Sequence, residues 1–421
     1  REIKHIFKGA IDAPLPPRVV ADAPCQETVI TDQIDIHRIL PIITHTADDA
    51  GPVLGGGVVL WADPEKQHSE LSFKRMFFRG QDWGTLNAVP GTHMANILAG
   101  AFENGAEKLA ITVNIGAPPA AMMVAAGFAP HVILRDGCDE AGIAGAVQGA
   151  PLEIVKGKTV DAWAIAQSEW VIEGYVLAQK DYETDEAARL DKAAVATFFP
   201  EWLGYQGKAL KSPRFEISAI THRADRPMFH SPLGAGWENE NLGRPLREGC
   251  VFKIAEQNAP ELVADLNIQF GQRMNSGLVL QVKKRGPEDD ALVKELLGKL
   301  LKTTLSRLVI AVDDDVDIYS ADDVIWAISS RMHNTEGIQR ARDGYPSLGY
   351  ILQEYTRASG CGGSEGIGLD TTAPFAARAT FKRAHYPSDS VDLKKWLTGA
   401  QIAEIEARQS DYAKLMARLG G

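Results

Sequence analysis

The sequence predicts a multidomain protein of mixed α+β and α/β class, with a β-rich first half, an α/β second half and a C-terminal helical arm. The chain has 421 residues, which is more than one typical hydrophobic core accommodates. Short β-type runs separated by glycine-rich breaks fill residues 27–223, whereas strands and helices alternate from residue 258 onward. Such alternation is typical of a layered α/β domain.

The first half consists mainly of expected strands. The runs between 27 and 80 are broken at Gly55, Gly56 and Gly57, and a helix is expected over 92–104. Residues 109–114 form the next strand, and the helix after it begins at Pro118 and Pro119, which a first helical turn tolerates. Further strands are expected at 152–155, 159–165, 169–177 and 215–223, with a polar helical insertion at 180–194.

The second half is expected to start with a helix over 258–268, because Asn258 is a good N-cap and Pro260 suits a first turn. Ser320 and Asp323 form a capping-box pattern that opens another helix. The remaining elements are strands at 276–282 and 308–312, helices at 288–304 and 321–332, and an amphipathic helix over 393–419 expected to pack on a partner subunit.

Composition and charge exclude several classes of protein. The net charge of −11 comes without any basic block, which argues against nucleic-acid binding. No run of 18 apolar residues occurs, so no transmembrane helix is expected. The four cysteines are far apart and form no CxxC pair, which favours a reducing, cytoplasmic location over a disulfide framework or a zinc knuckle: Cys25, Cys138, Cys250 and Cys361.

The segment HSELSFKRMFFRG, residues 68–80, has a strand pattern, yet it carries Glu70 and Arg75. One interpretation is a surface ion pair, which contributes little to stability. The other is a functional site. Two residues support it, His93 in VPGTHMAN and Glu140 in GCDEAGIAGAVQG, each at an expected helix start. Two carboxylates and an imidazole suit Mg²⁺, Mn²⁺ or Zn²⁺, although a histidine at a helix start is also a common cap or surface residue.

Other motifs in the sequence give weaker indications of function. The acidic run Asp313–Asp317 resembles a calcium loop, but Ile318 stands where an EF-hand loop needs glycine. Acids at a strand end are therefore the better interpretation. LGGGVV lacks the spacing of a dinucleotide fingerprint, and neither a P-loop nor a G-x-S-x-G elbow occurs.

Five segments, taken in order, resemble the UbiD family of prenylated-flavin-dependent decarboxylases. They are IGAPPAAMMVAAG at 115–127, the long segment from GAVQG to EGYV at 145–176, ITHRADRPMFHSPLGAGWENE at 220–240, VDDDVDIYSADDVIWAISSRM at 312–332 and GLDTT at 368–372. The resemblance runs over most of the chain. It implies a split β-barrel of the flavin-reductase type, an α/β oligomerisation domain and a C-terminal helix, divided as 1–20 (remnant of an N-terminal segment), 21–225, 226–392 and 393–421.

The resemblance also assigns a metal site. The family's N-x-x-x-x-R strand falls on Glu70 and Arg75, so Glu70 replaces the usual asparagine as first ligand, with His93 and Glu140 as the others. The metal, Mn²⁺ or Mg²⁺, bridges the cofactor phosphate, and K⁺ sits nearby. The extra negative charge of Glu70 requires an offsetting cation. Because residues five apart face opposite sides of a regular strand, a bulge or loop is expected at Glu70.

The cofactor implied is prenylated FMN, supplied by a flavin prenyltransferase. The contacts carried over are Arg75, Thr92, His93, Pro118, Ala125, Ala126, Gly127 and Glu140. The family's E-G-P-F-G-E stretch corresponds to ATFFPE, which keeps the last acid as Glu201 but has Ala196 in place of the first. Asp191 and Glu186 are candidate replacements. The phosphate-binding lysine often found near GLDAT has no evident counterpart, since Glu365 and Gly366 lie there.

The expected function is reversible, non-oxidative decarboxylation of an aromatic or α,β-unsaturated carboxylic acid in a homodimer or homohexamer. Arg75 is expected to hold the substrate carboxylate and Glu201 to protonate the carbon, within an apolar setting formed by Phe198, Phe199 and Trp202. Two alternatives remain open. One is an FMN-dependent oxidoreductase, and the other is a non-catalytic paralogue or assembly subunit.

Overall fold

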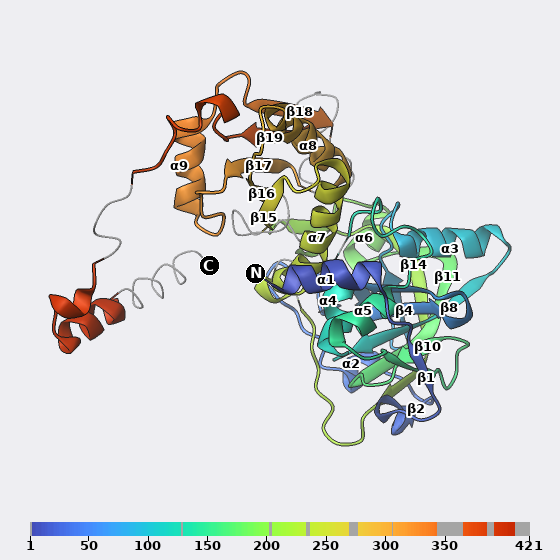
Figure 1. The fold of residues 1–421 in the computed structure, drawn as a ribbon. Coiled ribbons are helices and arrows are strands. Elements are labelled where there is room, and N and C mark those ends of the chain that lie inside the picture. The colour runs from blue at the N-terminus through green and yellow to red at the C-terminus, as the bar shows by residue number, and fades with distance from the viewer. Residues whose placement is uncertain are drawn as a thin grey trace. The chain divides into compact units, whose positions relative to one another are not determined.

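The computed structural model describes residues 2–127, 129–201, 204–232, 236–268, 277–304, 306–342, 365–384 and 391–408. The chain divides into two compact units, Arg1–Phe375 and Ala376–Gly421. Figure 1 shows the helices and strands of both units, which are described separately below.

The largest sheet in the described residues has nine strands, in the order β3-β6-β7-β14-β11-β8-β4-β5 with β2 paired to β14. Its centre is the long antiparallel pair of β11 and β14, flanked by β8. The strands are β2 (Thr28–Ile30), β3 (Val53–Leu54), β4 (Val58–Asp63), β5 (His68–Phe73), β6 (Met76–Phe78), β7 (Trp83–Leu86), β8 (Lys108–Ile115), β11 (Trp170–Tyr182) and β14 (Lys211–His222). The β-rich first half is therefore confirmed.

The two ends of this strand path are joined by two short connections. Strand β3, at one end, leads through residues 55–57 into β4 at the other end, and β5 leads through Lys74 and Arg75 back to β6. A Cβ on Gly56 would lie 2.0 Å from the ring of Pro232, so the first connection passes too close to that residue for a larger side chain. Among the described residues no pairing joins β3 to β5, so a closed barrel is not observed.

The segment 68–80 is two strands rather than one, and the prediction of a bulge at Glu70 is wrong. Glu70 lies in regular register opposite Trp61 on β4. The chain leaves the strand at Lys74 and Arg75, because β5 pairs with β4 whereas β6 pairs with β3 and β7. Because of this change of strand partner, and not because of a local bulge, Glu70 and Arg75 contact different parts of the molecule.

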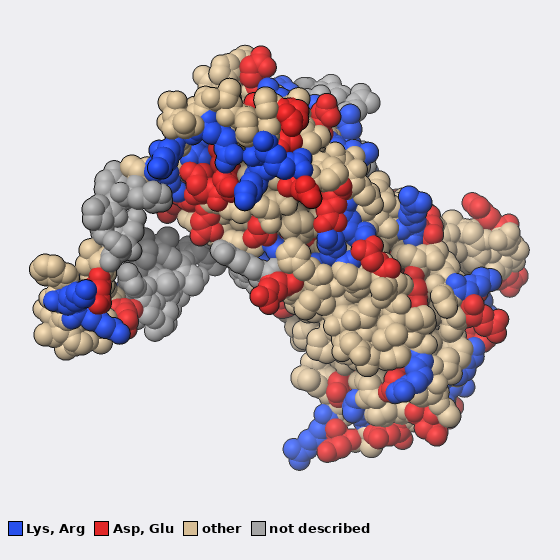
Figure 2. Space-filling view, in the orientation of Figure 1, with Lys and Arg blue, Asp and Glu red and all other residues tan. Residues whose placement is uncertain are grey.

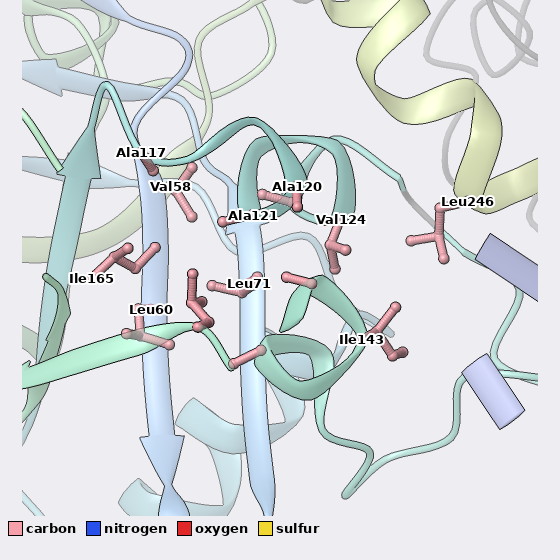
Figure 3. Close-up of a cluster of buried hydrophobic side chains, with 14 of the residues drawn as sticks. Val58, Leu60, Leu71, Ala117, Ala120, Ala121, Val124, Ile143, Ile165 and Leu246 are labelled. Atoms are coloured by element: carbon pink, nitrogen blue, oxygen red, sulfur yellow. The ribbon is translucent and has the colours of Figure 1, made fainter. Parts of the chain in front are cut away.

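Three helices pack beside β5: α3 (His93–Glu103), α4 (Pro119–Ala125) and α5 (Glu140–Gln148). In Figure 3, Leu60 of β4 and Leu71 of β5 face Ala121 of α4, and Leu246 projects from α7 toward Val124. These side chains are buried in one apolar cluster. The cluster fixes the starts of α4 and α5 against the strand that carries Glu70.

Smaller elements surround this core. A three-stranded sheet contains β1, β9 and β10, and a hairpin contains β12 and β13. Helix α1 packs on α5 and α7, and α6 lies in the polar insertion after β11. Their bounds are β1 (Arg18–Val20), β9 (Glu153–Lys156), β10 (Trp163–Ile165), β12 (Thr197–Pro200), β13 (Gln206–Lys208), α1 (Ile3–Asp12), α2 (Ile36–Ile39) and α6 (Asp185–Leu190).

The second half forms a five-stranded mixed sheet in the order β15-β16-β17-β19-β18. Apolar side chains of the sheet form two clusters. Helices α7 and α8 pack in one of them, and α9 packs in the other, which includes Val279 and Ile310. The bounds are α7 (Trp237–Asn258), β15 (Val263–Asn267), β16 (Gly277–Val282), α8 (Asp289–Thr303), β17 (Leu308–Asp313), α9 (Ala321–Arg331), β18 (Ile338–Arg342) and β19 (Glu365–Asp370). The predicted layered α/β region is confirmed.

The helix expected over 258–268 is wrong. Asn258 is the last residue of α7, and its side-chain amide donates to the carbonyl of Ile254 at 2.7 Å. The residues that follow form β15, which pairs antiparallel with β16. Asparagine is common at both ends of helices, so the pattern alone did not distinguish an end from a start.

Helix α9 begins as its capping pattern predicts. The hydroxyl of Ser320 accepts a hydrogen bond from the backbone N–H of Asp323 at 3.3 Å. We expect Ser320→Ala to lower the free energy of unfolding by about 1 kcal/mol, because a helix N–H loses its partner. Denaturant titration measures this. Ser329→Ala, which removes a hydroxyl bonded only to a carbonyl within the helix, is the control, and an equal effect of both would contradict the capping role.

The C-terminal unit contains a 3₁₀ turn at Leu393–Lys395 and helical residues 399–408. The predicted helix over 393–419 therefore starts later than expected, and its end lies outside the described residues. No helix among the described residues is long and apolar enough to cross a membrane. On the face shown in Figure 2, acidic and basic side chains are interspersed.

Candidate active site

The open edge of β5 positions two of the three predicted metal ligands. Ser69 pairs in a parallel bridge with Asp139, and the backbone N–H of Leu71 donates to Glu140 Oε2 at 2.7 Å. The Ser69 hydroxyl donates to Asp139 and accepts from the N–H of Ala141. Because an edge strand presents unpaired backbone groups, the start of α5 completes this edge and holds Glu140 beside Glu70.

His93 approaches the two acids from the first turn of α3. Its Nδ1 lies 3.0 Å from Glu140 Oε1 and 3.5 Å from Glu70 Oε2, and its Nε2 lies 3.0 Å from the carbonyl oxygen of Leu134. The His93 side chain is only 10% exposed. The fold therefore brings together Glu70, His93 and Glu140, which come from three separate elements.

Two groups of potential ligand atoms in the described chain are compact enough to hold a metal ion, and each has its atoms within 4.8 Å of one another. One contains His93, Cys138 and Glu140, and the other contains His93, His131 and Asp136. Glu70 belongs to neither group. Cys138 and His131 come close only through tertiary packing, and no motif of the sequence pointed to them as ligands.

A lysine lies beside these acids. Lys74 is buried, and its Nζ lies 4.0 Å from Glu70 Oε1. Burial lowers the pKa of Lys74, which the charges of Glu70 and Glu140 oppose. Lys74 and Glu70 therefore lie close together in a buried position.

The pKa values of two of the predicted ligands, Glu140 and His93, are shifted strongly. Burial raises the pKa of Glu140 to about 7, and the charge of Glu70 adds to this effect. For His93, burial lowers the pKa, but hydrogen bonds to Glu140 and Glu70 outweigh it and raise the pKa to about 10. A metal ion that bound here would have to displace a proton from the imidazole.

The side chain of Arg75 is 11% exposed and is held by two carboxylates. Its Nε and Nη2 donate to the two oxygens of Glu183 at 3.0 and 2.7 Å, and its Nη1 donates to Glu201. The guanidinium lies 4.6 Å from the ring centroid of Phe198. Burial lowers the pKa of Arg75, but the charges of Glu183 and Glu201 outweigh this effect and raise it.

Glu183, rather than Asp191 or Glu186, is the second acid beside Arg75. It is 1% exposed and lies between the end of β11 and the first turn of α6. Further hydrogen bonds come from the N–H of Leu210, the hydroxyl of Ser212 and the side chain of Asn87. Asp191 instead accepts from Tyr182, and Glu186 is exposed.

Glu201 lies at the tip of the hairpin formed by β12 and β13. Gly204 in this turn has a φ of 78°, which favours glycine, and its N–H donates to the carbonyl of Glu201. A Cβ on Gly207 would lie 2.5 Å from Glu201 Cγ, so glycine there leaves room for the acid. Phe198 and Phe199 are buried beneath it, as expected, whereas Trp202 lies outside the described residues.

The other predicted cofactor residues flank the ends of the helices beside β5. Thr92 precedes α3 and donates its hydroxyl to the carbonyl of Val89. Pro118 precedes α4, and residues 125–127 end it. No side chain of the described residues caps the start of α3, and unpaired N–H groups at a helix start favour anions such as a phosphate. Carboxylates, an imidazole and helix starts in one area fit a divalent metal that binds a phosphate.

Comparison with known proteins identifies the family of this chain. The family model for the 3-octaprenyl-4-hydroxybenzoate carboxy-lyase Rift-related domain matches residues 18–236, and that for the C-terminal domain of the same carboxy-lyase matches residues 240–346. The chain belongs to the UbiD family of carboxy-lyases. The resemblance noted from the sequence is thus confirmed.

Individual relatives agree with this assignment. The chain is 29% identical over 404 residues to a gallate decarboxylase of Lactiplantibacillus plantarum, covering 92% of this chain and 80% of the relative. It is similar in fold to a 3,4-dihydroxybenzoic acid decarboxylase from Enterobacter cloacae, with a TM-score of 0.79, 28% identity and coverage of 93% and 81%. It also resembles the UbiD-class enzyme HmfF from Pelotomaculum thermopropionicum in complex with FMN, with a TM-score of 0.78, 26% identity and coverage of 94% and 83%.

Proposed function

We propose that this protein catalyses the reversible, non-oxidative decarboxylation of an aromatic or α,β-unsaturated carboxylic acid with prenylated FMN. The arrangement of Arg75 between Glu183 and Glu201 carries this proposal. It combines a buried cation for a carboxylate with an acid for a proton. The gallate and dihydroxybenzoic acid decarboxylases among the relatives support hydroxylated benzoic acids as the first substrates to test.

Arg75 binds the substrate carboxylate in this proposal. Glu183 occupies the Nε and Nη2 side of the guanidinium, which keeps the plane of the group fixed. Nη1 is the donor that faces Glu201, so a substrate carboxylate competes with Glu201 for it. The planar, always charged guanidinium suits this contact better than a lysine would.

Glu201 holds and transfers the proton. In the structure it accepts a hydrogen bond from Arg75 Nη1. A substrate carboxylate at Nη1 would take the place of Glu201 there, and the Glu201 carboxyl would then donate the proton to the reacting carbon. Binding of the substrate thereby prepares the proton donor.

The residues beside β5 hold the cofactor. Glu70, His93 and Glu140 would bind Mn²⁺ or Mg²⁺, and the metal would bind the cofactor phosphate, while Thr92, Pro118 and residues 125–127 would line the flavin. When bound, the prenylated flavin supplies the electron sink for cleavage of the carbon–carbon bond. The connections at residues 55–57 and 74–75, which join the two ends of the strand path, support a split barrel around this site.

Four further expectations belong to this proposal: K⁺ near the phosphate, a flavin prenyltransferase as cofactor supplier, a homodimer or homohexamer, and a cytoplasmic location.

The decisive experiment is to co-express the chain with a flavin prenyltransferase and identify the released cofactor by mass and absorption spectra, with metal analysis alongside. We expect prenylated FMN and about one divalent metal per chain. The purified protein should then release CO₂ from gallate or 3,4-dihydroxybenzoate. Plain FMN that NADH reduces would instead favour an oxidoreductase, and a folded protein without cofactor or turnover would favour a non-catalytic paralogue.

A further inference from the structure

Helix α7 carries a buried arginine whose guanidinium is not paired with any described residue. Arg247 is 4% exposed, and its Nε is buried without a hydrogen-bond acceptor. In the described part of the chain, no hydrogen bond or ion pair engages its guanidinium. Glu240 and Glu248 lie near enough to favour its positive charge, yet burial dominates and lowers the pKa of Arg247 to about 10. The side chain is therefore still charged at neutral pH.

An unpaired buried guanidinium is expensive to maintain, because removing a charge from water costs several kcal/mol unless a counter-charge is present. Two partly buried arginines show what such a partner looks like. Arg75 has Glu183 and Glu201, and Arg331 has Asp313 and Asp315. Arg247 differs from both: Glu240 and Glu248 act on it without a hydrogen bond or ion pair in the described part of the chain, so its guanidinium has donors available for an anion.

The surroundings of Arg247 identify which anion fits. A Cβ built on Gly243 would lie 2.3 Å from the carbonyl oxygen of Ala126 and 2.9 Å from Arg247 Nη2. The guanidinium therefore reaches the end of α4, where residues 125–127 are proposed to line the flavin. Leu246 and Cys250 of α7 pack in one apolar cluster with Ala141 and Ala144, so α7 also passes near α5, the helix that begins at Glu140.

We propose that Arg247 binds the phosphate group of the flavin cofactor. A guanidinium donates two parallel hydrogen bonds to phosphate oxygens. The lysine that often binds the phosphate near this element of the family is missing beside GLDTT, where Glu365 and Gly366 lie instead. Arg247 thus supplies that positive charge from α7. This inference rests on the proposed function for the identity of the cofactor, although its test does not require decarboxylase activity.

The test compares FMN with riboflavin, which has the same ring system but no phosphate. Apoprotein is titrated with each, and quenching of flavin fluorescence gives the two dissociation constants. We expect Arg247→Gln to weaken FMN binding about 10- to 100-fold, the size of a lost hydrogen bond to a charged group, while riboflavin binding is unchanged. Lys253→Gln is the control on the same helix, because Lys253 already pairs with Asp12; its FMN affinity should equal that of the wild type.

Inorganic phosphate provides a second readout that needs no flavin. Phosphate should raise the thermal midpoint of the wild-type apoprotein but not of Arg247→Gln, because ligands that bind only the folded state stabilise it. Equal loss of FMN and riboflavin affinity in the variant would show a structural role and overturn the proposal, as would an unchanged preference for FMN. Failure of the decarboxylase assay alone, with the FMN preference still dependent on Arg247, would reject the proposed reaction but not this site.

Discussion

Glu201→Gln is expected to lower the rate of decarboxylation about 10²- to 10⁴-fold, the usual contribution of a positioned general acid. Glutamine keeps the shape of the side chain and an oxygen that can accept from Arg75 Nη1, but it has no carboxyl proton to transfer. Folding and flavin binding should therefore be retained. Release of ¹⁴CO₂ from a labelled carboxylic acid measures the rate.

The protonation step can be observed separately. In D₂O, the wild-type enzyme should exchange the product hydrogen at the reacting carbon, and Glu201→Gln should lose this exchange together with turnover. Glu65→Gln, at an exposed position, is the control and should match the wild type in both assays. Turnover by Glu201→Gln at the wild-type rate would remove Glu201 from the reaction.

Local patterns predicted the elements that depend on neighbouring residues. Ser320 caps α9 as its spacing to Asp323 indicates, and β16 and β17 lie where their apolar runs place them. Helix α7 was missed because Pro245 lies within it, and an internal proline normally ends a helix. Packing of α7 on α1, α4 and β15 compensates for the lost backbone hydrogen bond.

The residues of the candidate site also fall into two groups, those that sequence segments indicate and those that only the folded structure brings together. Glu70, Arg75, His93, Glu140 and Glu201 could be named from segments that resemble those of a family, because each lies within a recognisable stretch. Glu183 could not be named, since its role depends on contacts with residues far away along the chain.

The pairing of buried charged side chains could not be predicted from the sequence either. Lys74 Nζ lies 4.0 Å from Glu70 Oε1, a contact that the spacing of the two residues in the sequence does not indicate. A carboxylate and an ammonium four residues apart in a strand segment are usually unrelated. Only the burial of both, with the change of strand partner at Lys74, turns them into an internal pair.

Glu183→Ala should have the largest effect on stability. Removing this carboxylate leaves Arg75 buried with only Glu201 beside it, and breaking a buried ion pair from one side costs about 3–5 kcal/mol. The N–H of Leu210 and the hydroxyl of Ser212 lose an acceptor at the same time. The free energy of unfolding, measured by denaturant titration with tryptophan fluorescence, should fall by this amount.

Two further variants separate the role of the charge from that of the shape. Glu183→Gln keeps the acceptor oxygen, so it should lose less stability than Glu183→Ala, yet it no longer neutralises Arg75, and its KM for the acid substrate should change. Glu186→Ala removes an exposed acid from the same insertion and should alter stability by less than about 0.5 kcal/mol. If Glu183→Ala lowered the free energy of unfolding as little as Glu186→Ala, Glu201 alone would be sufficient to hold Arg75. The proposal that Glu183 holds the guanidinium permanently, while Glu201 gives way to the substrate, would then be wrong.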